Sequence, residues 1–352
     1  LYDYCQLLLL THLRLCQNAA GNAVEIDTSM IQCRYKEVST MTTTLQEYSF
    51  ISDADALEIS VLRCTPAGRP RAIIQLVHGM AEHKERYMDF MQYLGELGYL
   101  CVLHDHRGHG KSIRREDDLG YMGTTKAAAL IEDIRQLNAQ LHREYPSLKI
   151  YMSGHSMGSL AVRAYLKRYD DTIDALIVCG SPSKNPAAGA GKLLCKLMKC
   201  MKGAHYRSPL IQKMAFGNHC DGFAEEGSDN VWLCSDMEVV RAYDHDPLCG
   251  YTFTLNGFEN LFSLMQDVYE RKNWTLRNRT LPIRFIAGSE DPCIIRRGKF
   301  QEAAGLLREV GYSDVSARLF DGMRHEILNE PDHLLVYEDV SAFLLKVEEK
   351  NT

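Results

Sequence analysis

The sequence has no apolar run of 18 or more residues, so it offers no candidate for a membrane-spanning helix. It also lacks an excess of basic residues, because 40 Lys and Arg stand against 46 Asp and Glu and the net charge is −6. Proteins that bind nucleic acids concentrate Lys and Arg on one surface. We therefore expect no DNA or RNA partner.

Paired cysteines are missing as well, since the 12 cysteines are scattered without a C-x-x-C motif. Cys101 and Cys179 lie within apolar runs, where a thiol behaves as a small buried hydrophobe. Free thiols of this kind indicate a reducing compartment. The leucines at 7–10 are followed at once by Thr11 and His12, so this run is too short for a secretory signal. These features predict a cytoplasmic protein.

At 352 residues the chain is long enough for one large α/β domain with an insertion. Hydrophobic residues make up 45% and charged residues 24% of it, as in ordinary globular proteins. Residues 1–40 show no clean hydrophobic period, whereas patterned sequence starts just after Met41. Two explanations stay open. Either Met41 is the native start and 1–40 is an extension, or an ordinary N-terminal helix covers residues 7–15.

Short apolar runs recur along the chain and are typical of parallel strands that helices cover on both faces. Helical patterns, with apolar residues at every third or fourth position, separate them at 85–97, 125–144 and 159–169. Two strand-like pieces between 47 and 61, the second alternating, predict an antiparallel edge. The apolar runs occupy residues 72–77, 100–103, 150–152, 175–179, 283–287 and 317–320.

Strand and helix alternate in this order, which predicts a parallel sheet with right-handed crossovers and helices on both faces. The alternation breaks after Ser181 for about a hundred residues before the strands resume. We predict a core at 41–182 and 263–350 and an inserted helical cap at 183–262.

A G-x-S-x-G motif at 154–158 places Ser156 between two glycines. Alone it is weak, because this pattern arises by chance in roughly one chain of this length in ten. Here it follows an apolar strand at 149–153 and opens the helix at 159–169. A nucleophile elbow needs that strand-turn-helix setting, with glycines that tolerate strained backbone and close packing. We therefore predict Ser156 as a nucleophile.

A serine hydroxyl attacks well only when a histidine, oriented by a carboxylate, takes its proton. In this kind of fold the order along the chain is serine, acid, histidine. Asp291 follows the strand predicted near 282–288, and His325 follows the last predicted strand. Glu290 is an alternative to Asp291, and His333 is an alternative to His325.

The helix after Ser156 points its N-terminus at the reacting carbonyl, so the Met157 N–H is a candidate oxyanion donor. A second donor comes from the loop after the third strand. Met80 N–H is the candidate there, and Gly79 lets the chain turn. Together these elements predict an α/β-hydrolase fold, with a mostly parallel eight-stranded sheet, helices on both faces and an inserted helical cap.

His104, His106 and His109 surround Asp105. Such a group could bind a metal ion, but its spacing matches no zinc motif. We expect no metal site and place this loop at the rim of the active site instead.

With these residues placed, the sequence resembles the monoacylglycerol lipase and lysophospholipase branch of the α/β-hydrolases, often labelled serine aminopeptidase-like. The resemblance extends from about Leu45 to Phe343. It rests on His-Gly-Met-Ala-Glu-His at 78–83 with Arg86-Tyr87, on 104–110 with Ser112, on 154–158, and on the Asp291 and His325 segments. It implies a catalytic triad of Ser156, Asp291 and His325 and an oxyanion hole from the amides of Met80 and Met157.

The resemblance also places Glu82 and Arg86 near the polar head-group end of the substrate pocket, although a structural ion pair explains them equally well. The chain departs from the animal enzymes in the cap. Residues 246–250, Asp-Pro-Leu-Cys-Gly, look more like those of uncharacterised bacterial hydrolases labelled lysophospholipase.

Within the predicted cap, lysines recur every three or four residues from Lys192 to Lys202. A basic amphipathic helix of this type can lie on a membrane surface, where a lipid substrate enters. The alternative is a lid helix that packs over the pocket with its lysines in solvent, and both hold if the lid opens. The apolar residues on the other faces are Leu193, Leu194, Leu197, Met198 and Met201.

These features predict a serine hydrolase that cleaves carboxylic esters of lipid-like substrates, monoacylglycerol or lysophospholipid, through an acyl-enzyme on Ser156. Neither a metal nor an organic cofactor is expected. An aminopeptidase or amidase of the same fold is the alternative, with Glu225, Glu226 or Asp229 as an anchor for a substrate ammonium group. A binding module without activity is a further alternative, which a full triad disfavours.

Overall fold

The computed structural model describes residues 43–124, 127–223 and 227–350. The predicted extension at 1–40, the start at Met41 and the alternative helix at 7–15 lie outside these residues. Within the described ranges, no helix is both long and apolar enough to cross a membrane.

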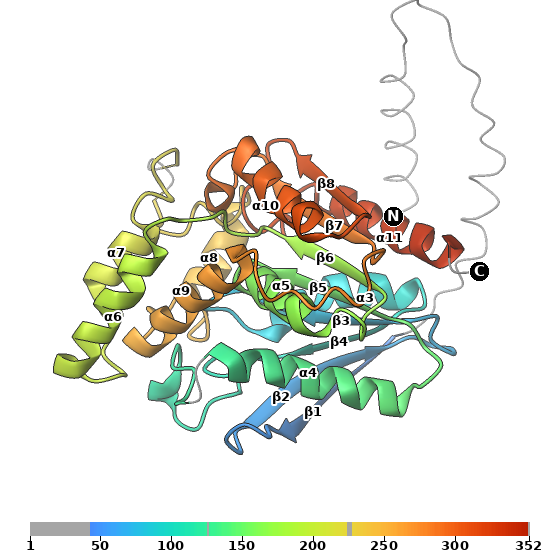
Figure 1. Cartoon of the computed structure of the whole chain (residues 1–352), viewed down its shortest axis with the longest axis horizontal. Coiled ribbons are helices and arrows are strands. Elements are labelled where there is room, and N and C mark those ends of the chain that lie inside the picture. Colours follow the sequence, from blue (N-terminus) through green and yellow to red (C-terminus); the bar gives the residue numbers. More distant parts are fainter. Residues whose placement is uncertain (1–42, 125–126, 224–226, 351–352) are drawn as a thin grey trace, which may run out of the picture. The chain divides into compact units, whose positions relative to one another are not determined.

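The fold is built on one sheet of eight strands (Figure 1). They are β1 (Thr44–Ile51), β2 (Glu58–Thr65), β3 (Ile73–Val77), β4 (Leu100–His104), β5 (Ile150–His155), β6 (Ala175–Cys179), β7 (Ile283–Gly288) and β8 (Val315–Phe320). Their order across the sheet is β1-β2-β4-β3-β5-β6-β7-β8. The pairs β1/β2 and β2/β4 are antiparallel, and the other neighbours are parallel. The predicted antiparallel edge and parallel core are confirmed.

Helices cover both faces of the sheet (Figure 1). In the core they are the 3-10 helices η1 (Lys84–Tyr87), η2 (Glu116–Asp118) and η4 (Pro292–Ile294), and the α-helices α3 (Met88–Glu96), α4 (Ala127–Glu144), α5 (Met157–Tyr169), α10 (Arg297–Val310) and α11 (His333–Lys350). In β7, Phe285 and Ala287 pack with α4, α5 and α10, whereas Ile286 packs with α3 and α11. Because successive side chains of a strand point to opposite faces, a continuous apolar run supplies two cores.

The helix predicted at 85–97 has an irregular first turn. Residues 84–87 form η1, and α3 begins only at Met88. Asp105, directly after β4, accepts hydrogen bonds from the Lys84 backbone N–H at 2.9 Å and from Lys84 Nζ at 2.8 Å. These contacts tie the first turn to the neighbouring strand, so regular α-helical geometry starts about one turn later.

The described residues between β6 and β7 form helices and no named strand. These helices are α6 (Ala188–Lys202), α7 (Pro209–Phe216), α8 (Met237–His245) and α9 (Leu255–Tyr269). α9 packs against both α6 and α5. It also runs without a break past residue 262, where we placed the end of the cap. The predicted boundary between cap and core at residues 262 and 263 therefore falls inside one continuous helix.

The chain turns sharply at Ser156, between β5 and α5, with φ 53° and ψ −119°. A residue with a Cβ adopts positive φ only under strain. The turn brings α5 so close to β3 that a Cβ on Gly158 would lie 2.2 Å from the Val77 carbonyl oxygen. A Cβ on Gly154 would lie 2.5 Å from the Gly158 carbonyl oxygen. Both flanking positions therefore require glycine.

Gly158→Ala is expected to lower the free energy of unfolding by about 1–3 kcal/mol, because the backbone of β3 cannot retreat from the added methyl group. Gly305→Ala in α10 is the control, since nothing lies within 4 Å of its added Cβ. That control should gain about 0.5–1 kcal/mol, as alanine favours helices. Denaturant titration measures both values. An unchanged stability of the Gly158 variant would contradict the close approach of α5 to β3.

Candidate active site

An acidic residue and a histidine meet at the carboxyl ends of β7 and β8. His325 Nδ1 lies 2.9 Å from Asp291 Oδ1, and the two side chains are 2% and 0% exposed. Glu290, the alternative acid, is exposed. His333, the alternative base, lies at the start of α11 and contacts the carbonyl of Glu330. Of these alternatives, the structure brings together Asp291 and His325.

The contact with Asp291 sets the tautomer of His325. An ionised carboxylate only accepts hydrogen bonds, so Nδ1 carries the proton and Nε2 is the basic nitrogen. Within the described part of the chain, Nε2 has no hydrogen-bond partner. The His325 ring lies 4.7 Å, centroid to centroid, from that of His155, the residue before Ser156. Nε2 can therefore act as an acceptor near the elbow, and such catalytic contacts commonly tighten only when substrate binds.

The two amides predicted for the oxyanion hole belong to segments next to Ser156. A Cβ added to Gly79 would lie 3.2 Å from Ser156 Cβ, so the loop carrying Met80 rests against the elbow. Met157 is the first residue of α5. Amides of a first helical turn have no partner inside the helix and carry the positive end of its dipole. Both segments can thus present donors to a developing negative charge.

The inserted region holds the loop after β3 in place. Ala81, at φ 52°, accepts hydrogen bonds through its carbonyl from Gly250 N–H at 3.0 Å and from Tyr243 Oη at 2.9 Å. His83 Nε2 lies 2.9 Å from Asp246 Oδ2. Asp246 and Gly250 belong to the segment whose sequence looks like that of bacterial hydrolases. That segment therefore fastens the candidate oxyanion loop to the inserted helices.

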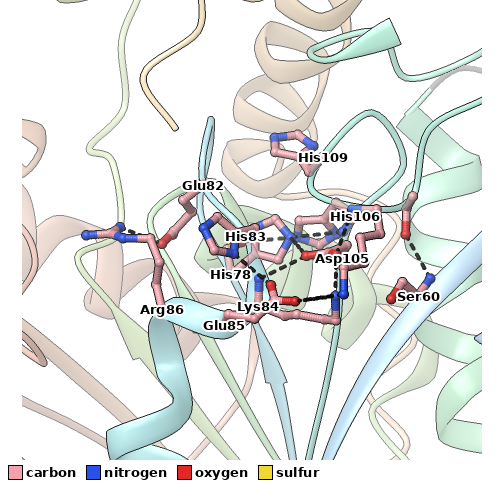
Figure 2. Close-up of polar contacts among 12 residues, drawn as sticks. Ser60, His78, Glu82, His83, Lys84, Glu85, Arg86, Asp105, His106 and His109 are labelled. Carbon is pink, nitrogen blue, oxygen red and sulfur yellow. Dashed lines mark hydrogen bonds and ion pairs between the residues drawn. The ribbon is translucent and has the colours of Figure 1, made fainter. Parts of the chain in front are cut away.

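Glu82 and Arg86 form a buried ion pair (Figure 2). Arg86 Nη1 lies 2.9 Å from Glu82 Oε2, and the side chains are 12% and 5% exposed. Arg86 also makes a two-point contact with Glu326, at 2.7 and 2.6 Å. Of the two explanations for Glu82 and Arg86, the structural ion pair fits this geometry better.

Some residues around His325 were not singled out from the sequence. Trp232 packs its ring 5.0 Å from that of His325, centroid to centroid, and its carbonyl accepts the His325 N–H. His219 stacks on Trp232 at 4.9 Å. Burial, reinforced by nearby His325, lowers the pKa of His219 to about 4, so its ring is neutral at pH 7. No motif in the sequence links Trp232 or His219 to His325. Glu326 could have been suspected as a neighbour of the site, because it directly follows His325 in the chain.

The histidines around Asp105 are not at the rim of the site. His104 and His109 are 0% and His106 is 1% exposed, and the latter two pack against His78 (Figure 2). Burial lowers the pKa of His104 to about 3 and that of His109 to about 4, so both rings are neutral. The predicted rim position is therefore wrong, because these rings fill a buried space behind the candidate oxyanion loop.

Two groups of described side chains bring possible metal ligands within 4.8 Å of one another. They are His83, Asp246 and Cys249, and Asp291, Cys293 and His325. In each group a histidine nitrogen lies 2.9 Å from a carboxylate oxygen. These hydrogen bonds satisfy the histidine and the carboxylate of each group.

Comparisons with known proteins support the predicted fold and the predicted branch of the α/β-hydrolases. Residues 68–332 match the family model described as serine aminopeptidase, S33. The chain is 29% identical over 306 residues to a monoacylglycerol lipase of Mycolicibacterium smegmatis. The aligned region covers 87% of this chain and 99% of that protein. It is 24% identical over 289 residues to the human monoglyceride lipase, covering 81% and 85% of the two chains.

Among solved structures, a thermostable carboxyl esterase from Bacillus coagulans in complex with glycerol matches with a TM-score of 0.80 and 26% identity. The match covers 87% of this chain and 99% of the esterase. A soluble variant of monoglyceride lipase from Saccharomyces cerevisiae shares the fold, with a TM-score of 0.67 at 18% identity and coverage of 88% and 97%. The predicted fold is confirmed. The chain belongs to the serine aminopeptidase S33 family of α/β-hydrolases, in the branch of its monoacylglycerol lipase relatives.

Proposed function

We propose that this protein is a serine hydrolase that cleaves carboxylic esters of lipid-like substrates through an acyl-enzyme on Ser156. The observation that carries the proposal is the buried contact of 2.9 Å between Asp291 and His325, close to the strained turn at Ser156. A nucleophile, a base and an acid in this chain order make up the acyl-transfer machinery of the fold.

In the proposed reaction, His325 Nε2 takes the hydroxyl proton of Ser156 while Oγ attacks the ester carbonyl. Asp291 accepts the Nδ1–H of His325 and stabilises the imidazolium that forms. The amides of Met80 and Met157 donate hydrogen bonds to the oxyanion. The alcohol leaves with the proton from His325. Water, deprotonated by the same nitrogen, then releases the acid and regenerates the serine.

The names of the relatives support the proposed substrate class. They are a monoacylglycerol lipase, monoglyceride lipases and a phospholipase of Bacillus subtilis. The structural neighbour from Bacillus coagulans was solved with glycerol, a product of monoacylglycerol hydrolysis. We therefore propose esters with one fatty acyl chain, monoacylglycerol or lysophospholipid, as substrates.

An aminopeptidase is the second candidate, because the matching family model carries that description. It requires an acidic anchor for the ammonium group of a peptide. Asp229, one suggested anchor, is exposed, and exposed ion pairs contribute little in water. Glu225 and Glu226 lie outside the described residues. Ester hydrolysis is therefore the preferred proposal.

Ser156→Ala is expected to lower kcat on a p-nitrophenyl ester by about 1,000-fold or more and to abolish labelling by a fluorophosphonate probe, because no acyl-enzyme forms. Glu290→Gln is the matched control at the exposed neighbour of the candidate acid and should keep full activity. Wild-type turnover by the Ser156 variant would refute the proposed nucleophile.

A substrate panel tests the proposed class. We expect kcat/KM for 1-monoacylglycerol or lysophosphatidylcholine to exceed that for proline p-nitroanilide by at least about tenfold, because the buried carboxylates Glu82 and Glu326 beside the site already pair with Arg86. Purified wild-type protein is assayed with all three compounds at one pH. A preference for the anilide would favour the aminopeptidase instead.

We further propose that the inserted helices touch membrane surfaces. On α6, Leu193, Leu197 and Met201 recur every fourth residue and are 59%, 57% and 74% exposed. α7 adds Leu210 and Met214, and both helices lie at the left in Figure 1. Lysines flank this apolar surface on α6, as in helices that bind anionic interfaces. Leu194 and Met198, by contrast, pack against the core.

Changing Leu193, Leu197 and Met201 together to serine is expected to reduce binding to phosphatidylcholine/phosphatidylglycerol vesicles by at least about tenfold, because apolar area no longer enters the interface. Turnover of a short soluble ester should stay unchanged. The control changes Leu334 and Leu335, exposed at 50% and 42% on α11, to serine. Equal vesicle binding by wild type and the α6 variant would contradict the proposed contact.

A further inference from the structure

Four ionisable side chains that the proposed chemistry does not use form a largely buried network beside the active site. Glu82 belongs to the candidate oxyanion loop. Arg86 belongs to η1, which directly follows that loop in the chain. His155 precedes Ser156, and Glu326 follows His325. Glu82, His155 and Glu326 are 4%, 6% and 4% exposed. The network therefore reaches each segment that must be aligned for acyl transfer.

Arg86 joins the two carboxylates of this network. Its Nη1 donates to Glu82 Oε2 at 2.9 Å, and Figure 2 shows the two side chains facing each other. Nη1 and Nη2 also donate to the two oxygens of Glu326, at 2.7 and 2.6 Å. A two-point contact of a guanidinium with a carboxylate fixes orientation as well as distance. Residues 86 and 326 are thereby held in one relative position.

The second half of the network runs through His155. Glu82 Oε1 accepts the backbone N–H of Gly79 and lies 3.5 Å from His155 Nδ1. His155 Nε2 lies 3.1 Å from the carbonyl oxygen of His325. A continuous chain of polar contacts thus leads from the candidate oxyanion loop, past the elbow, to the loop of the candidate base.

Basic and acidic side chains alternate within the network. Burial alone would lower the pKa of His155, but the Glu82 carboxylate raises it above its usual value. Burial would raise the pKa of Glu326, yet the guanidinium of Arg86 lowers it. A guanidinium and an imidazole therefore face two carboxylates. Removing one partner would leave an uncompensated buried charge, whereas replacing a whole pair by apolar side chains is often nearly neutral for stability.

The space beside the network does not suit a substrate head group. The cavity that its four residues line, together with Phe90, has a volume of about 10 Å³. That is room for about one water molecule. A glycerol or phosphate group needs far more. The contacts of the network join the protein's own loops.

We propose that the Arg86–Glu326 pair is a positioning device that sets the candidate oxyanion loop at a fixed distance from His325. This inference rests on the serine-hydrolase function proposed above. The oxyanion amides and the base must act on the same ester carbonyl, and a displacement of about 1 Å can lower the rate about 100-fold. Without the pair, the polar chain through Glu82 and His155, with its longer contact of 3.5 Å, would be left to hold the loops after β3 and β8 together.

Two variants separate positioning from simple stabilisation. Glu326→Gln keeps the shape of the side chain and removes its charge, so kcat on a soluble ester should fall about 10- to 100-fold while KM changes less than about 2-fold. Arg86→Met combined with Glu82→Gln and Glu326→Met removes the guanidinium together with both carboxylates that it contacts. Its melting temperature should recover toward the wild-type value, relative to Glu326→Gln. Its kcat should stay low, because the two-point contact is still missing.

Asp339→Asn is the matched control. The Asp339 side chain is 7% exposed and accepts a two-point contact from Arg284. Arg284 lies near the start of β7, whereas Asp291 follows the end of that strand. This variant should lower the melting temperature without changing kcat.

Wild-type kcat in Glu326→Gln, or recovery of kcat together with the melting temperature in the triple variant, would overturn the positioning role. Both outcomes leave the loss of turnover in Ser156→Ala untouched. Persistent turnover in Ser156→Ala would instead refute the proposed function, so the two failures are distinguishable.

Discussion

The close approach of three backbone segments at Ser156 is the constraint on which the rest of the site depends. β3, β5 and the start of α5 come so near to one another that neither Gly154 nor Gly158 has room for a Cβ. The positive φ of Ser156 follows from this crowding. Because the carboxyl ends of parallel strands meet at one edge of the sheet, the loops after β3, β7 and β8 converge on the same turn. The contact between Asp291 and His325 forms at that edge.

The loop after β3 is held from two sides. On the core side, ion pairs anchor it, since Lys84 pairs with Asp105 at 2.8 Å and Arg86 pairs with Glu326. On the side of the inserted helices, hydrogen bonds to the Ala81 carbonyl and the contact between His83 and Asp246 hold it. Ion pairs with both partners buried tolerate little displacement, because separation exposes each charge to a poorly solvating interior. The loop is therefore fixed by the core and linked to the inserted region.

Much of the fold could be predicted from the sequence, because a strand covered on both faces leaves a continuous apolar run that is visible without a structure. The elbow could be predicted for a similar reason, since its glycines and its strand-turn-helix setting are local. The first turn of the helix at 85–97 could not, because Asp105, 21 residues away, reshapes it. The rim position of His104, His106 and His109 was wrong, because histidine in a polar motif gives no sign that its ring is buried.

The sequence by itself determined the parallel sheet, the position of Ser156 on a sharp turn and the chain order of the candidate nucleophile, acid and base, because each depends on neighbouring residues or on periodicity. Only the tertiary structure decided which acid meets His325, since Asp291 and Glu290 are adjacent in the chain and differ by burial. It also decided the pairing of Arg86 with Glu326, which are 240 residues apart. Contacts over such distances arise from the packing of strands against one another, and no local pattern encodes which side chains that packing brings together.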